Sequence, residues 1–336
     1  MAEQADALVV NTYNTGMSNE PGVTGHDYAA WIEQQVRDIL AAVAPTARPG
    51  FRLYLSAPAY PLLVHANGSI SHDPGVENVR YAVRGIRRAA AALSAAGAPE
   101  LQHLAGIALY AHSDGTGRDG YAAIDREWRW WHQELAAESV PPPSVPPAHA
   151  VWLGHRWATG QHAEPVAAML DRLHPAGIRH FFVNLGLLDA SGRLPAREQP
   201  LLDLLEQVQA WERERGERIV LWAWVAGRTD RTDIGQPSVR QRIAAEAARV
   251  VALRGPGGRR FEGVITGLLP VGGRDTFKAY QALIDTMRQR LGWNVRLGLA
   301  SPRYADEAGS PWHWGPVEFY YMARRVDLLV VQTYNS

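Results

Sequence analysis

Histidine and aspartate stand two residues apart at His112 and Asp114, a spacing that could support acid–base chemistry. Alternate side chains of an extended segment point the same way, so this carboxylate could orient the imidazole as a general base. The segment 113–117 is also rich in turn-forming residues, which leaves a plain loop as the other interpretation. His155 and Tyr13 are two more candidate catalytic residues, because each lies at the end of a short apolar run.

Polar and aromatic residues gather at the ends of other apolar runs, where parallel strands present ligand-binding side chains. Trp222 and Trp224 share one run and one face, which is either a platform for a ligand or part of the core. The arginines at such positions either bind an anion or pair with an acid. The candidate ligand-binding residues of this kind are Tyr13, Asn14, Tyr60, Tyr110, Arg156, Asn184, Trp222, Trp224 and Arg303.

Composition narrows the possible partners. The chain has no cysteine, which excludes disulfides, thiolate metal sites and a thiol nucleophile. Its 34 basic and 34 acidic residues are intermixed, so we expect neither nucleic acid nor a membrane surface as a partner. His112, Asp114 and His155 lack the spacing of metal ligands, and we predict no metal and no other cofactor. A small-molecule or glycan ligand fits this composition better.

The first residues of the chain do not form a basic region followed by a long apolar stretch. No segment of the sequence is long and apolar enough to span a bilayer. As written, the sequence therefore predicts a cytoplasmic protein.

Short apolar runs alternate with helical patterns along the 336 residues. Strict alternation of this kind predicts parallel strands joined by right-handed helical crossovers. We expect strands at 7–13, 52–57, 104–111, 150–155, 180–185, 219–225, 263–268, 295–300 and 328–333. We expect helices at 28–43, 76–94, 124–137, 164–173, 201–215, 238–253 and 275–291.

The two ends of the chain carry the same ten-residue pattern. Residues 6–15 and 327–336 align without gaps, with seven identical positions, and each copy is an apolar run followed by Thr-Tyr-Asn. If both copies are alternatives for one strand, the nine expected strands reduce to the eight of a closed barrel. The unused copy then predicts a frayed terminus or a strand-swapped homodimer.

The proline-rich segment 140–148 interrupts the alternation of strands and helices. It is either a stiff surface loop or a linker that joins an ancestral C-terminus to an ancestral N-terminus. The terminal repeat favours the linker. We therefore expect one barrel domain over residues 1–336, with 140–148 as its internal joint.

Several of these strands resemble the family-18 glycoside hydrolases, the family of many chitinases. Segment 261–270 matches the fourth strand of that family's barrel, and segments 9–14 and 330–335 both match the sixth. The segments 52–60, 106–111 and 152–157 resemble the seventh, eighth and first strands. The resemblance implies a circularly permuted (β/α)8 TIM barrel with a duplicated strand at the two termini, and family relatives are often exported.

The resemblance also places Gly267 and Leu269 at the mouth, where the family has its catalytic Asp and Glu. In that family the Glu protonates the leaving oxygen while the acetamido group of the substrate attacks. Glycine and leucine cannot transfer a proton, and Asn14 and Asn335 replace a further carboxylate of the family. The site thus lacks a general acid, although Gly267 and Leu269 still belong to the candidate ligand-binding set.

Three hypotheses follow. The first is a degenerate barrel that binds a glycan or related ligand, for which restoring Asp at 267 and Glu at 269 should return some hydrolysis. The second is an enzyme of different chemistry that uses His112, Asp114, His155 or Tyr13 at the same mouth. The third is a rearranged or engineered scaffold. The sequence leaves the ligand and any remaining catalysis open.

Overall fold

The computed structural model describes residues 7–12, 15, 17–47, 50–59, 62–64, 68, 70–110, 149–269, 273–301, 303–304, 313–314 and 316–331. The chain divides into two compact units. Unit 1 comprises Met1–Val151 with Val331–Ser336, and unit 2 comprises Trp152–Val330.

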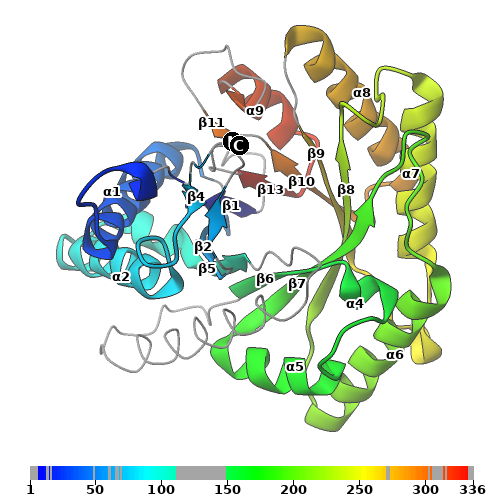
Figure 1. Ribbon diagram of the computed structural model, residues 1–336, viewed down its shortest axis with the longest axis horizontal. Coiled ribbons are helices and arrows are strands. Elements are labelled where there is room, and N and C mark those ends of the chain that lie inside the picture. The colour runs from blue at the N-terminus through cyan, green and yellow to red at the C-terminus, as the bar shows by residue number, and fades with distance from the viewer. Residues whose placement is uncertain are drawn as a thin grey trace. The chain divides into compact units, whose positions relative to one another are not determined.

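Unit 1 has a parallel sheet, described here for its placed residues, whose strands are joined by long helices (Figure 1). The helices α1 and α2 pack closely at Gly85, because an added Cβ there would lie 2.3 Å from the Ala29 carbonyl oxygen. The sheet order is β1-β2-β5. The elements are β1 (Ala7–Asn11), β2 (Arg52–Pro58), β5 (Leu104–Tyr110), the antiparallel hairpin β3 (Leu63–Val64) and β4 (Ile70–His72), α1 (Gly25–Val43), α2 (Val79–Ala95), and the short 3-10 helices Met17–Asn19, Ala44–Thr46 and Pro99–His103.

Unit 2 contains a second run of parallel strands, in the order β7-β8-β9-β10 (Figure 1). Its strands are β7 (Ile178–Leu187), β8 (Val220–Arg228), β9 (Gly263–Leu269), β10 (Arg296–Ser301), β13 (Leu328–Val331) and the short pair β11 (Arg303–Tyr304) and β12 (His313–Trp314), and β6 (His149–Leu153) spans the division between the units. Its helices are α4 (Arg156–Thr159), α5 (Val166–Leu173), α6 (Glu198–Arg215), α7 (Pro237–Ala252), α8 (Gly273–Leu291), α9 (Pro316–Ala323) and the 3-10 helices His174–Ala176 and Pro256–Gly258.

The strand order of the described residues, β1-β13-β10-β9-β8-β7-β6-β5-β2, is that of a closed parallel barrel. The fold is therefore an α/β barrel of the TIM type, as the alternation of strands and helices predicts. Both copies of the terminal repeat form strands, β1 and β13, so this order contains nine strands where we expected eight. The predicted helix 124–137 and the proline-rich segment 140–148 lie outside the described residues, and the circular permutation stays a prediction.

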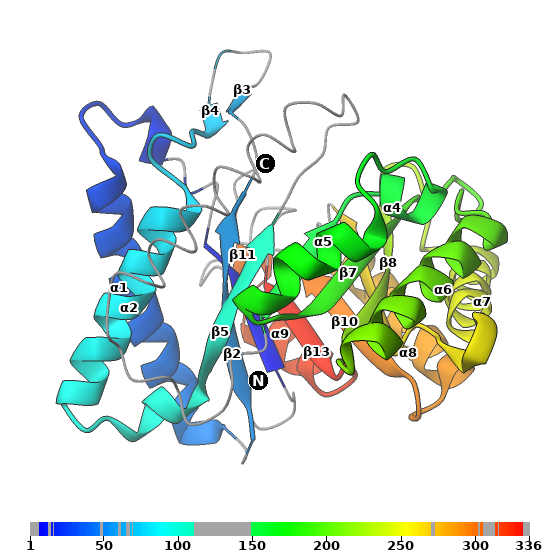
Figure 2. The same ribbon diagram turned by 90° about the horizontal axis from the view of Figure 1, so that it is seen from below.

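The sheet of unit 2 has helices along one face (Figures 1 and 2). Alternate strand residues on one face are sealed, and Val183, Ala223 and Leu268 are each 0% exposed. The opposite face carries Trp222 and Trp224, of which Trp224 is half-buried. The Trp152 and Trp224 rings come from the strands on either side of β7 and lie 4.6 Å apart between centroids, as side chains do on the concave side of a curved sheet. The tryptophans therefore belong to the concave face of this sheet, which we call the inner face of unit 2.

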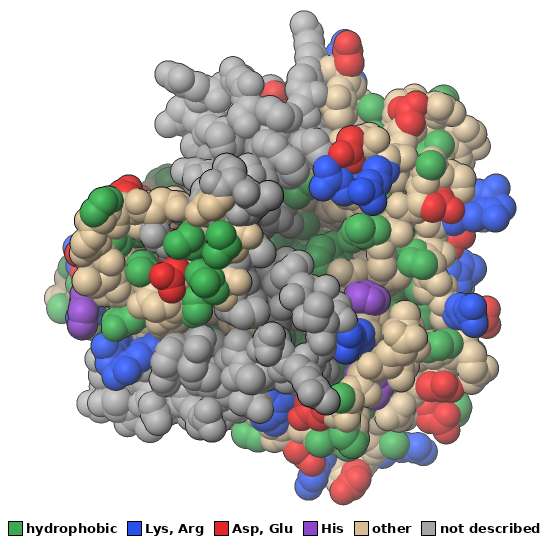
Figure 3. Space-filling model, viewed as in Figure 1, with side chains coloured by type: hydrophobic (Ala, Val, Ile, Leu, Met, Phe, Trp, Pro, Cys, Tyr) green, Lys and Arg blue, Asp and Glu red, His purple; other side chains and the backbone are tan. Residues whose placement is uncertain are grey.

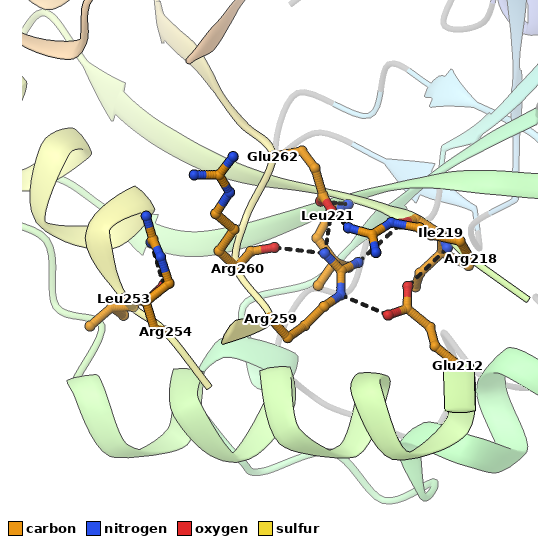
Figure 4. A network of polar contacts seen from close by, with 9 residues as sticks. All are labelled: Glu212, Arg218, Ile219, Leu221, Leu253, Arg254, Arg259, Arg260 and Glu262. Atoms are coloured by element: carbon orange, nitrogen blue, oxygen red, sulfur yellow. Dashed lines mark hydrogen bonds and ion pairs between the residues drawn. The ribbon is translucent and has the colours of Figure 1, made fainter. Parts of the chain in front are cut away.

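An arginine buried between two glutamates ties the amino ends of β8 and β9 together (Figure 4). The Arg259 side chain is 2% exposed and forms ion pairs with Glu212, at 3.0 Å, and with Glu262. The two carboxylates accept backbone N–H groups, Glu212 from Ile219 at 3.0 Å and Glu262 from Leu221 at 2.8 Å. These contacts lie at the strand edge opposite the carboxyl ends, so they fix where the strands start.

The same arrangement recurs before β13. Asp327 donates its backbone N–H to the Leu297 carbonyl at 2.7 Å and accepts the Leu297 N–H on its carboxylate at 2.8 Å. The buried Arg288 guanidinium pairs with this carboxylate at 2.9 Å. Glu262 makes both backbone contacts with Leu221 in the same way, paired with Arg259. We call each acid–arginine arrangement at a strand start a strand brace.

We expect the unfolding free energy of His174→Gln to fall less than that of the wild type as the pH is lowered below neutral. Burial lowers the pKa of His174 below the ordinary value for histidine, and Arg179 adds to this while Glu217 opposes it. The folded state therefore favours the neutral ring. Its contribution is complete above the ordinary histidine pKa of about 6.5 and is lost as the pH falls from there through the lowered pKa of the folded state, since the unfolded chain then binds more protons.

Urea unfolding across this pH range measures the effect. His155→Gln is the matched control, because His155 is exposed and its side chain makes no cap hydrogen bond to α4. An unchanged slope in His174→Gln, or an equal change in both variants, would contradict the assignment.

Candidate functional site

Aromatic side chains form a continuous row on the inner face of unit 2. The Trp152 ring of β6 lies 4.5 Å from Phe182 of β7 and 4.6 Å from Trp224 of β8, between ring centroids. Phe182 lies 5.9 Å from Trp222, whose indole N–H donates to His180 at 3.3 Å. Most of this row is core, because Trp152, Phe182 and Trp222 are at most 3% exposed.

Trp224 differs from the rest of the row. It is half-buried, and its indole Nε1 is enclosed without a hydrogen-bond partner among the described residues. Asn184 lies beside it in the register of β7 and β8, also half-buried, with its side-chain oxygen accepting the Gly186 N–H at 2.8 Å. A partly exposed aromatic ring next to a carboxamide can hold an amphipathic ligand.

The two positions of the missing acids share this inner face. Ile265 pairs with Trp224 in the register of β8 and β9, so Gly267 and Leu269, two and four residues on, point to the same side. Leu269 is half-buried. Gly267 is enclosed, and a Cβ added there would lie 2.9 Å from the Cβ of Ala300. The face thus offers no carboxylate at these positions, and 267 has no room for one.

Charged groups at the end of β8 are paired with each other. Arg228 donates two hydrogen bonds to Asp230, at 2.6 and 2.9 Å, and both side chains are exposed. The hydrogen bond raises the pKa of Arg228 and lowers the pKa of Asp230. On the face shown in Figure 3, acidic and basic side chains of the described residues are interspersed.

The carboxyl ends of the strands in unit 1 carry a buried acid that the sequence analysis missed. Glu77 is 0% exposed and accepts hydrogen bonds from the backbone N–H (2.9 Å) and hydroxyl (2.5 Å) of Thr15, just after β1. Asn11 and Ser56, in register on β1 and β2, are also buried, and the Asn11 Oδ1 and Ser56 Oγ atoms have no hydrogen-bond partner within the part of the chain that the structure describes. In the sequence, Glu77 stands next to Asn78, the N-cap residue of α2.

The remaining predicted site residues lie either away from the aromatic row or outside the described residues. His155 is exposed just before α4, and the half-buried Arg156 begins that helix. Neither lies in the aromatic row. Tyr13, Asn14, Tyr60, His112 and Asp114 lie outside the described residues, as do the side chains of Tyr110 and Arg303. The structure therefore places Asn184, Trp222, Trp224, Gly267 and Leu269 on one face of the sheet.

Within the described part of the chain, no group of three or more histidine, aspartate or glutamate side chains is arranged to hold a metal ion. None of the helices described is both long and apolar enough to cross a membrane.

Comparisons with known proteins give weak likenesses. No family model matches the chain, and no curated protein does. Among solved structures, the chain resembles the Group IV chitinase of Ostrinia furnacalis, with 18% identity and a TM-score of 0.39 over 54% of this chain and 49% of that one. The chitinase domain of the spore coat protein CotE from Clostridium difficile is 14% identical, with a TM-score of 0.31 over 49% of this chain and 45% of that one.

A 2,3-dimethylmalate lyase gives 14% identity and a TM-score of 0.38 over 89% of this chain and 80% of that one. The chain spans only about half the length of the chitinases that it resembles. At these identities and TM-scores, the likenesses carry no conclusion about activity or substrate.

Proposed function

We propose that the inner face of unit 2 binds a glycan or a related small ligand without the hydrolysis typical of family 18. The observation that carries this proposal is Trp224, whose half-buried ring lies in the middle of β8, beside the half-buried Asn184 of β7. Sugars have apolar C–H faces edged by hydroxyls. Such a surface suits an aromatic ring with a few polar groups around it.

The proposal includes the identity of the barrel. The cyclic order of the strand motifs supports a circularly permuted family-18-like barrel whose Asp and Glu positions are Gly267 and Leu269. General acid catalysis contributes about 10²–10⁴-fold, and these residues cannot supply it. Binding with no measurable turnover is the expected behaviour.

Trp224→Ala tests the binding proposal. Loss of the ring should weaken binding of chitooligosaccharides about tenfold, as expected for one aromatic contact, in isothermal titration calorimetry. Trp293→Ala is the matched control, because Trp293 is 74% exposed between α8 and β10, at the opposite strand edge. A wild-type chain that binds none of the oligosaccharides, or an equal loss in both variants, would overturn the proposal.

A further inference from the structure

The turn after β8 is held in place at the carboxyl end of the sheet. The Arg228 carbonyl accepts the Thr232 N–H at 2.8 Å, and the buried Thr232 hydroxyl donates to the Asp189 carbonyl at 3.0 Å. On the other side, the Thr229 N–H donates to the Leu269 carbonyl at 3.2 Å. The turn is therefore fixed both to the segment after β7 and to the end of β9.

Arg228 continues the inner face of unit 2 to the carboxyl end of β8. It lies four residues after Trp224, so the two side chains point to the same side of the strand, about 13 Å apart along it. The positions between them on β8 and β9, Ala226 and Gly267, are register partners and carry no bulky side chain. An oligosaccharide spans this distance, whereas a single sugar does not.

The Arg228 guanidinium and the Asp230 carboxylate form a pair without net charge. The two hydrogen bonds, at 2.9 and 2.6 Å, join two guanidinium nitrogens to the two carboxylate oxygens. Within the described part of the chain, the remaining N–H groups and lone pairs of this pair make no other side-chain hydrogen bond. Neighbouring sugar hydroxyls can use both, because one hydroxyl accepts from the guanidinium and the next donates to the carboxylate.

We propose that the Arg228–Asp230 pair makes the inner face of unit 2 specific for neutral glycans, by binding neighbouring hydroxyls of one sugar unit. This rests on the proposed function of that face and adds the class of glycan. Asp230 already neutralises Arg228, so a carboxylate or sulfate on the ligand finds no free cation there. The Asp230 carboxylate also repels such a group, which discriminates against acidic glycans.

Asp230→Asn tests this proposal, because it frees the charge of Arg228 and keeps the size of the side chain. Isothermal titration calorimetry compares chitotetraose, which is neutral, with a hyaluronan tetrasaccharide, which carries carboxylates. The wild type should bind chitotetraose at least about tenfold more tightly. In Asp230→Asn this preference should fall about tenfold, as expected for one charge-assisted hydrogen bond gained by the acidic ligand.

Asp171→Asn is the matched control. It frees Arg215 on α6 from a pair of similar exposure, 46% and 42% against 46% and 48% for Arg228 and Asp230. The preference for chitotetraose should stay at the wild-type value in this control. An equal shift in both variants would overturn the proposal, because the net charge of the chain would then set the preference.

Two further outcomes separate this proposal from the proposed function. If the wild type binds chitotetraose and Asp230→Asn leaves the preference unchanged, the neutral-glycan proposal is wrong and the binding face stands. If the wild type binds neither oligosaccharide, both are wrong. The wild-type comparison needs no variant, so it decides the case of an Asp230→Asn chain that fails to fold by far-UV circular dichroism. Equal wild-type affinities for the two ligands then contradict the proposal.

Discussion

Arg259→Met is expected to destabilise the protein by about 3–5 kcal/mol, the usual cost of removing one partner from a buried charge pair. The substitution leaves Glu212, 9% exposed, and Glu262, 19% exposed, without the cation that lies between them. It also removes the donor to the Ile219 carbonyl at 3.0 Å. Chemical unfolding monitored by tryptophan fluorescence measures the change in free energy.

Arg218→Met is the matched control. Arg218 pairs with the same Glu262, at 3.4 Å, but its side chain is 74% exposed. An exposed pair contributes about 0–1 kcal/mol, so the control should stay close to the wild type. Similar losses in the two variants would show that burial of Arg259 does not set its contribution.

Gly267→Asp is expected to destabilise the chain rather than restore an active site. The new Cβ would lie 2.9 Å from the Ala300 Cβ and 3.3 Å from the Ala300 carbonyl oxygen. These atoms belong to the backbone or are attached directly to it, so β10 must move. Overpacking of this kind costs about 1–3 kcal/mol. The unfolding free energy of Gly267→Asp, measured beside the wild type, checks this.

A second substitution separates the steric effect of an Asp side chain at position 267 from the effect of its charge. Ala300→Gly removes the Cβ nearest to position 267, so the pair Gly267→Asp and Ala300→Gly should recover part of the lost stability. Leu269→Glu needs no such relief, because Leu269 is half-buried at the strand end. A Gly267→Asp variant as stable as the wild type would contradict this prediction, because it would show that β10 can move to admit the side chain without loss of stability.

Much of the fold could be predicted from the sequence. Buried parallel strands appear as continuous apolar runs, and the predicted strands at 52–57 and 263–268 match Arg52–Pro58 and Gly263–Leu269 within a residue. Helix α9 was missed, because Pro316–Ala323 is rich in aromatic residues that also favour strands. The two-residue strands β11 and β12 are too short to show any period.

The site was less predictable for related reasons. Spacing alone puts Trp222 and Trp224 on one face, but a strand buried on both sides has no polar alternation to show which face is inner. Glu77 was missed because charged residues are usually exposed, and only the contact with Thr15 identifies it as buried. The crowding at Gly267 comes from β10, which is distant in sequence.

The strand braces also affect which parts of unit 2 can vary in sequence without loss of the fold. They hold β9 and β13 at their amino ends, whereas Trp224 lies in the middle of β8 and Leu269 at the carboxyl end of β9. Register is therefore set by one edge of the sheet and ligand contacts by the other. New loops can be grafted onto the carboxyl ends without disrupting the contacts that set the strand register. Unit 2 is therefore a suitable framework for new binding specificities.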